Sequence, residues 1–186
     1  MPVGWLAIRA ARGGLGADPI REIENELGLS ALIFLIAATA CSPARRLWGW
    51  TWAMRVRREL GLFAFGYALI HFLTYMLLDQ FFDWNGILQD ILQRPFITVG
   101  FSALVLLTPV AITSTNGWVK RLGFARWQRI HWLVYPAAIL AGVHFVWRVK
   151  LDVRQPLAYA LVIGVLLFLR ITWWLRKRYA QGTALT

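Results

Sequence analysis

The sequence has little cysteine and little negative charge, with one cysteine and nine acidic residues among 186. With Cys41 alone, no intramolecular disulfide can form and no CxxC-type metal or redox motif exists. Charged residues make up 16% of the chain, whereas a soluble domain normally carries about 25%. The composition therefore argues against a water-soluble globular domain and against a cysteine-based site.

Apolar residues dominate instead, at 59% of the chain, and 15% of the residues are aromatic. Several apolar runs approach or exceed the roughly 18 residues that indicate a membrane-spanning helix. We predict an all-α, polytopic membrane helix bundle that forms a single domain over residues 1–186. Its five spans cover residues 27–42, 60–78, 96–113, 130–147 and 157–174. The first run is short, ends at Pro43 and would require local thinning of the bilayer or help from neighbouring helices.

The net charge of +11 could indicate nucleic-acid binding, but the basic residues lie in short loops between the apolar runs. Residues 45–59, 120–129 and 170 onward hold 13 basic residues and one acid, Glu59, whereas the rest of the chain holds 7 basic and 8 acidic residues. The two sides, at +12 and −1, recover the net +11. The positive-inside rule places the first side, with the C-terminus, in the cytoplasm. The expected partner is thus the lipid bilayer and not nucleic acid.

Three histidines lie within or at the edge of these spans, where an imidazole is costly and is a functional candidate by default. At 1.5 Å rise per residue, His71 lies about 18 Å from the cytoplasmic start of its helix, and His144 about 21 Å from the start of its own. The two are nearly level. A level pair of histidines on separate helices is what axial ligation of a porphyrin iron requires.

The residues around this pair are suited to a bulky cofactor. Small side chains on the same helix faces would leave room, and Arg148, one turn beyond His144, could meet a propionate by a charge-assisted hydrogen bond. The flanking residues are Ala64, Ala68, Tyr67, Thr74 and Tyr75 around His71, and Ala137, Ala138, Ala141 and Gly142 around His144.

The third histidine, His131, lies at the cytoplasmic boundary. It is 13 residues from His144, which on one continuous helix separates the two by about 140° in angle and roughly 20 Å along the axis. The two therefore cannot bind the same small metal ion. We predict that His131, which shares a face with Tyr135, serves a second heme or an inner-leaflet redox site such as a quinone.

Other interpretations of the histidines compete with heme ligation. A membrane histidine hydrogen-bonded to a neighbouring helix can be ordinary packing. A zinc site or a proton pathway is disfavoured, because no Asp or Glu lies inside the predicted spans. A non-redox transporter or scaffold would use the same fold without any cofactor.

Several motifs are recognisable along the chain: GGLGADP at residues 13–19, RPFITVG at 94–100, TST at 113–115, the pattern WQRIH…Y…AILA…HFVWRVK at 127–150, and QPL at 155–157. Together they resemble the MsrQ (YedZ) family, within the ferric-reductase-like transmembrane superfamily. The resemblance covers nearly the whole chain from Gly13 onward. The family usually has another transmembrane helix before GGLGADP, whereas twelve residues precede it here, so the start is either shortened or this member uses five spans.

The resemblance implies a bacterial inner-membrane electron-transfer subunit, distinct from the catalytic subunit of its oxidoreductase complex. It implies heme b held by histidines matching His71, His131 and His144, and FMN in some members. Electrons would come from the quinone pool or a flavin reductase. They would pass to MsrP, a periplasmic molybdopterin enzyme that reduces methionine sulfoxide in oxidised proteins.

A self-contained reductase of the ferric-reductase or NADPH-oxidase type is the second hypothesis. Such proteins carry a cytosolic flavin and nicotinamide domain, whereas this chain ends at Thr186, twelve residues after its last predicted span. They also carry four heme histidines, and this chain has three. A ferric-reductase-like oxidoreductase with another electron acceptor remains an alternative.

Overall fold

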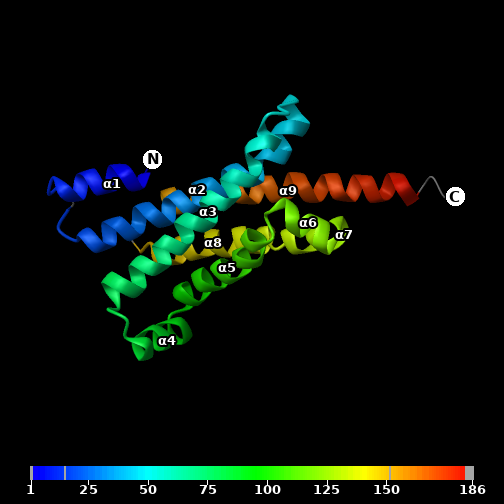
Figure 1. The fold of residues 1–186 in the computed structure, drawn as a ribbon. Coiled ribbons are helices and arrows are strands. Elements are labelled where there is room, and N and C mark those ends of the chain that lie inside the picture. Colours follow the sequence, from blue (N-terminus) through cyan, green and yellow to red (C-terminus); the bar gives the residue numbers. More distant parts are fainter. Residues whose placement is uncertain (1, 15, 151, 183–186) are drawn as a thin grey trace.

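The computed structural model describes residues 2–14, 16–150 and 152–182, and it folds them into helices joined by short turns (Figure 1). The elements are α1 (Pro2–Ala11), α2 (Pro19–Trp48), α3 (Ala53–Thr74), the π-helical turn η1 (Tyr75–Asp79), α4 (Trp84–Gln93), α5 (Pro95–Ile112), α6 (Asn116–Leu122), α7 (Phe124–His131), α8 (Val134–Arg148) and α9 (Arg154–Gly182). Five stretches of the described chain are long and apolar enough to cross a membrane: α2, α3 with η1, α5, α7 with α8, and α9. The predicted all-α, polytopic membrane architecture is confirmed.

Two helix pairs form the centre of the bundle: α2 packs along α3, and α5 packs along α8. The helix α9 covers α8 and part of α2. Their shared core contains small residues, since Ala64, Ala137 and Ala138 are 1%, 0% and 2% exposed. Small residues let membrane helices approach closely. On the outside of the bundle, large apolar side chains such as Leu161 and Phe168 of α9 are exposed, as a lipid-facing surface requires.

The first span differs from its prediction, because helix α2 does not end at Pro43. It has 30 residues and continues through the proline to Trp48, where Gly49 adopts a left-handed conformation and closes the helix. Proline inside a membrane helix is tolerated where its surroundings satisfy the freed carbonyl group. The span is therefore not short, and it needs no thinning of the bilayer.

The GGLGADP loop fixes the start of α2. Asp18 caps the helix by accepting a hydrogen bond from the Arg21 N–H at 3.2 Å. The Glu22 carboxylate accepts from the Gly16 N–H at 2.8 Å and pairs with Arg9 of α1 at 2.6 Å. The loop thus works as a cap that ties α1 to α2.

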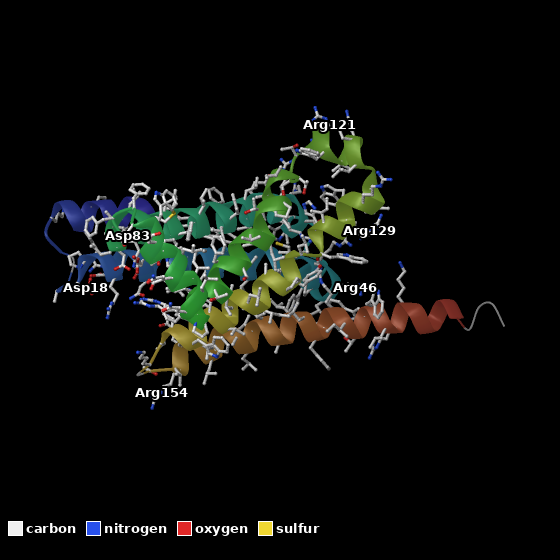
Figure 2. The ribbon with its side chains drawn as sticks, turned by 90° about the horizontal axis from the view of Figure 1, so that it is seen from below. Asp18, Arg46, Asp83, Arg121, Arg129 and Arg154 are labelled. Carbon is white, nitrogen blue, oxygen red and sulfur yellow. The ribbon has the colours of Figure 1, made fainter. Side chains whose placement is uncertain are left out.

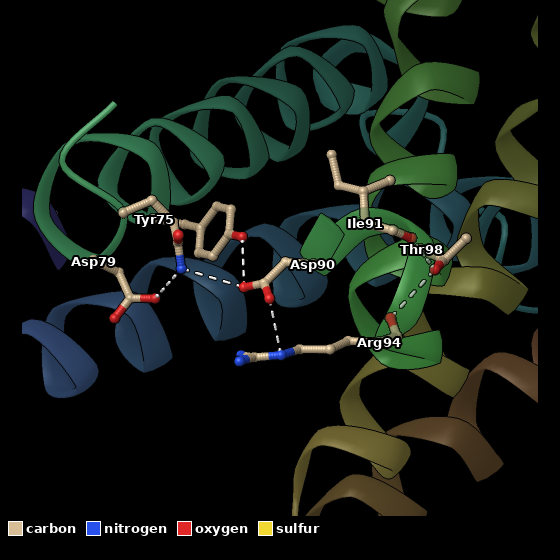
Figure 3. A network of polar contacts seen from close by, with 7 residues as sticks. Tyr75, Asp79, Asp90, Ile91, Arg94 and Thr98 are labelled. Carbon is tan, nitrogen blue, oxygen red and sulfur yellow. Dashed lines mark hydrogen bonds and ion pairs between the residues drawn. The ribbon is translucent and has the colours of Figure 1, made fainter. Parts of the chain in front are cut away.

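The acidic segment after the second span contains a helix, α4, that the sequence analysis treated as a loop. Asp83 caps it by accepting from the Asn85 N–H. In Figure 3, Asp90 of α4 accepts hydrogen bonds from the Tyr75 hydroxyl at 3.0 Å and from the Gln80 amide at 3.2 Å, and it pairs with Arg94 at 3.0 Å. These contacts connect η1, through Tyr75 and the following Gln80, to the start of α5.

The fourth span is broken, whereas the sequence analysis treated residues 130–147 as one helix. Helix α7 ends at His131 and α8 begins at Val134. Pro136 has no N–H to offer the Trp132 carbonyl, which accepts instead from the Tyr135 N–H at 3.1 Å. The angle of 140° between His131 and His144 therefore does not apply, because it assumed a continuous helix.

The two ends of the bundle carry different charges (Figure 2). Asp18, Asp83 and Arg154 lie at one end, and Arg46, Arg121 and Arg129 lie at the other. The second end gathers the loop between α2 and α3, the helices α6 and α7, and the last turns of α9 (Figure 1). The loops that the sequence analysis assigned to one side thus lie together. We call this the basic end, and the opposite one the acidic end.

Candidate functional site

His71 of α3 and His144 of α8 meet between the two central helix pairs. Their ring centroids are 6.3 Å apart, and the ring planes are inclined by 72°. These residues are 73 positions apart in the chain, yet counting helical rise placed them at one level. The structure therefore brings the predicted pair together.

Each imidazole is held by a backbone carbonyl of the partner helix in its pair. The Nδ1 atom of His71 lies 2.9 Å from the carbonyl oxygen of Glu24 in α2, and that of His144 lies 2.7 Å from the carbonyl oxygen of Phe96 in α5. A carbonyl oxygen only accepts hydrogen bonds, so Nδ1 must carry the proton on both rings. Both Nε2 atoms then keep a lone pair, and neither hydrogen-bonds to another described residue. Metal-binding histidines use this arrangement.

The spacing of the two rings suits one metal ion bound between them. Imidazole–metal bonds are about 2.0–2.1 Å long in zinc sites, so two imidazoles on opposite sides of one ion have centroids roughly 6 Å apart. In the part of the chain that the structure describes, no three His, Cys, Asp or Glu side chains gather as a metal site. A bare zinc ion, which takes four ligands, would find two here. The pair therefore fits a metal that brings its other ligands with it.

Charged groups lie beside this pair at the acidic end. Arg148 ends α8 and is close enough to interact electrostatically with both imidazoles and with Glu24. One oxygen of the Glu24 carboxylate is buried without a hydrogen-bond partner among the described residues. Arg148 itself makes no hydrogen bond or ion pair with the residues that the structure describes. A cationic group free to bind an anion is thus present where the sequence analysis expected one.

His131 occupies a different setting, at the basic end. Its Nδ1 lies 3.1 Å from the Trp127 carbonyl oxygen in the same helix, and its ring centroid is 4.0 Å from that of the Trp127 indole, with the two planes inclined by 32°. Its Nε2 is 3.4 Å from the Ser114 hydroxyl oxygen, a long contact because that hydroxyl donates to the Val110 carbonyl at 2.6 Å. His131 is therefore anchored within its own helix.

A cavity of about 280 Å³ opens beside His131. Its wall is mainly apolar, with Leu107 and Phe65 among the lining residues, and Arg57 and Arg58 add positive charge. It lies between α3, α5, α6 and α7, and neither His71 nor His144 lines it. The structure thus separates His131 from the imidazole pair, although the helix break invalidates the angular argument for that separation.

The small residues predicted to make room for a cofactor have another role in part. Ala64, Ala137 and Ala138 are buried in the core where the helices pack together. The two carbonyl groups that hold the imidazoles, those of Glu24 and Phe96, were not among the predicted site features. Every residue has a carbonyl, so the identity of these two residues could not have indicated them.

The fold and the site together define a class: a polytopic helical membrane protein with a two-imidazole site between its central helices. The family described as ferric reductase like transmembrane component matches residues 26–142. The chain is 50% identical over 178 residues to a protein of Rhodospirillum rubrum named protein-methionine-sulfoxide reductase heme-binding subunit MsrQ, covering 96% of this chain and 86% of that one.

Two further relatives carry the same name. The protein of Herminiimonas arsenicoxydans is 50% identical over 180 residues, covering 96% of this chain and 83% of that one. The protein of Xanthomonas euvesicatoria is 48% identical over 185 residues, covering 98% of this chain and 84% of that one. This chain therefore belongs to the MsrQ family, within the ferric-reductase-like transmembrane proteins.

Proposed function

We propose that this chain is the heme-binding membrane subunit of a methionine sulfoxide reductase system and that His71 and His144 hold one heme b. The observation that carries the proposal is the pair of rings 6.3 Å apart, each with its Nδ1 against a carbonyl and its Nε2 free. The names of the relatives, which call them heme-binding subunits, support it. We take residues 1–186 as one ferric-reductase-like transmembrane domain.

The donor set of this site suits heme in two ways. The two imidazoles would hold the iron, and a porphyrin would supply the ligands that the protein does not. Arg148 would pair with a heme propionate at the acidic end, where no described residue occupies it. A heme held by His71 and His144 would supply one-electron transfer.

The protein's own part is to bind, orient and insulate this group. The Glu24 and Phe96 carbonyls keep Nδ1 protonated and so keep both Nε2 atoms available as ligands. The histidines come from α3 and α8 and their carbonyl partners from α2 and α5, so four helices meet at the site and leave both imidazoles partly buried. A site of this kind is suited to relaying electrons and not to transforming a substrate, which assigns the chain the role of a non-catalytic subunit.

We place the electron donor at the basic end, facing the cytoplasm, and the acceptor at the acidic end. The excess of arginine and lysine at the basic end supports this orientation in a bacterial inner membrane. The cavity beside His131 is the candidate entry point, where either a quinone or a second heme would contact the imidazole. A flavin reductase is the other candidate donor, and it would deliver electrons to the same end.

The acceptor in this proposal is a periplasmic, MsrP-like molybdopterin subunit that repairs oxidised proteins. The family resemblance also implies FMN in some members. We assign FMN no residues: the imidazole pair suits a metal, and the cavity beside His131 is one candidate place for a flavin. A pull-down with the periplasmic subunit tests the partner, and flavin fluorescence of the acid-denatured protein tests FMN.

The central experiment is a visible absorption spectrum of the purified protein, oxidised and then reduced with dithionite. We expect the spectrum of a low-spin b-type heme at about one heme per chain for the imidazole pair. Colourless protein from heme-replete cells would overturn the proposal and favour a transporter or scaffold. Addition of NADH without a partner should leave the heme oxidised, whereas direct reduction would indicate a self-contained reductase.

A further inference from the structure

The two imidazoles are held by the same construction, repeated in the two central helix pairs. In each pair, the first helix supplies a carbonyl and the second supplies the histidine. Glu24 precedes His71 by 47 residues, and Phe96 precedes His144 by 48. Each carbonyl is followed four positions later by a glycine inside the helix, Gly28 in α2 and Gly100 in α5.

These glycines lie directly against the imidazole rings. A Cβ atom built on Gly100 would lie 2.6 Å from Nδ1, 2.8 Å from Cε1 and 3.0 Å from Cγ of His144. A Cβ on Gly28 would lie 3.3 Å from Cε1 and 3.4 Å from Nδ1 of His71. By contrast, a Cβ on Gly164 of α9 would meet nothing within 4 Å. A close approach alone is not unusual, since a Cβ on Gly142 would lie 3.3 Å from Cδ1 of Ile163. Among the described glycines, Gly28 and Gly100 are the two at which a Cβ would meet an imidazole.

Helix geometry explains the spacing of four. The carbonyl of residue i points toward residue i+4, whose N–H it normally accepts. The Cα–Cβ bond of residue i+4 is tilted back toward the N-terminus, so a side chain there shields that same carbonyl. Glycine at i+4 leaves the carbonyl open to a second donor from a neighbouring helix. The imidazole Nδ1–H is this second donor in both helix pairs.

We infer that Gly28 and Gly100 are positioning residues, which uncover the Glu24 and Phe96 carbonyls so that His71 and His144 present Nε2 to one heme iron. The inference rests on the proposed heme function and adds two residues to it. Neither glycine contacts the iron. Each acts through the histidine, by allowing the Nδ1 hydrogen bond that fixes the tautomer and the ring orientation.

The test compares three glycine-to-alanine variants, each purified with its heme. Gly100→Ala places an atom where no ring can remain, so His144 must turn away from the Phe96 carbonyl. We expect the heme affinity to fall by about 10–100-fold, the range typical for loss of an outer-shell partner. Heme that is retained should show a high-spin component in the electron paramagnetic resonance spectrum, since one axial imidazole is displaced.

Gly28→Ala requires a shift of only a few tenths of an ångström. It should lower heme affinity by less than about tenfold and change the low-spin resonance positions without a high-spin component. Gly164→Ala is the matched control, another glycine inside a membrane-length helix, and should match the unaltered protein. The expected order of effect therefore follows the Cβ distances.

The outcomes separate this inference from the heme proposal itself. If the unaltered protein holds no heme, the proposed function fails. If it holds low-spin heme and Gly100→Ala matches Gly164→Ala in affinity and resonance spectrum, the function stands and the positioning role is wrong. A loss of thermal stability with an unchanged resonance spectrum would also overturn it, because glycine would then serve helix packing alone. Should Gly100→Ala not yield monodisperse protein, unchanged resonance positions in Gly28→Ala would decide against the inference.

Discussion

The histidines at the acidic and basic ends of this bundle are held by different kinds of contact. At the acidic end, two rings from different helices meet, and each is fixed by a carbonyl from another helix. At the basic end, His131 is fixed by its own helix and faces a cavity of about 280 Å³. A pair of rings held from two helices suits a resident cofactor, whereas one histidine at an open cavity suits an exchangeable donor. Under the proposed function, the pair would hold the electron and the cavity beside His131 would be its point of entry.

The largest expected effect on heme content comes from replacing either histidine of the pair. His71→Ala or His144→Ala removes one of two axial ligands, so the reduced-minus-oxidised absorbance of the low-spin heme should disappear. The measurement is the heme-to-protein ratio in detergent, with a pyridine hemochrome assay. His131→Ala serves as the control for loss of an imidazole from the same membrane region. Unchanged heme content in both pair variants would show that the pair is not the ligand set.

The opposite result is expected for His131→Ala. Loss of this ring leaves the carbonyl-braced pair untouched, so the low-spin heme should remain. Reduction by a quinol should slow by about tenfold or more, because the donor loses its partner in the cavity. Stopped-flow reduction, first with quinol and then with dithionite, separates electron transfer from the donor from the ability of the heme itself to be reduced. If His131→Ala removes half of the heme instead, His131 ligates a second heme.

The common level of His71 and His144 was predictable from helical rise, although the count from Ile130 to His144 crosses the turn between α7 and α8. The helix α4 was also predictable in principle: Trp84, Leu88 and Leu92 repeat every four residues after the capping residue Asp83. The acidic character of the segment hid this pattern. By contrast, the one mark of the Glu24 carbonyl in the sequence is Gly28 four positions later, and a helix glycine has this meaning only once the fold places a histidine against it.

Prolines show where sequence reasoning fails for membrane helices. Pro43 lies inside α2 without ending it, whereas Pro136 coincides with the break between α7 and α8. Both lack the same N–H, so the residue alone does not decide the outcome. The neighbours that satisfy the freed carbonyl decide it, and those are known only from the fold.

Replacing Pro136, beside the break between α7 and α8, should have an effect of intermediate size on the rate of reduction. Pro136→Ala supplies the missing N–H to the Trp132 carbonyl and favours one continuous helix, which would rotate His131 relative to the cavity. Quinol-dependent reduction should slow, by less than about tenfold, while the heme of the pair keeps its spectrum. Pro43→Ala is the control, because α2 already continues through its proline. An altered heme spectrum in Pro136→Ala would contradict the independence of the two ends.

The smallest expected effect concerns the charge beside the pair. Arg148 lies close enough to both imidazoles to act on them electrostatically, and reduction of a bound heme removes one positive charge there. A nearby cation therefore favours the reduced form, so Arg148→Gln should lower the midpoint potential. We expect a shift of roughly 20–60 mV, because about 59 mV corresponds to a tenfold change in a one-electron equilibrium.

Arg154→Gln is the matched control for that shift, since Arg154 lies exposed at the same end (Figure 2). Solvent screens an exposed charge, so this variant should leave the potential within a few millivolts of the unaltered protein. A spectroelectrochemical titration of both variants measures the difference directly. Equal shifts would mean that Arg148 acts only through the overall charge of the acidic end. A shift confined to Arg148→Gln would assign it to the imidazole pair, and the quinol-dependent rate should then change only as far as the altered driving force requires.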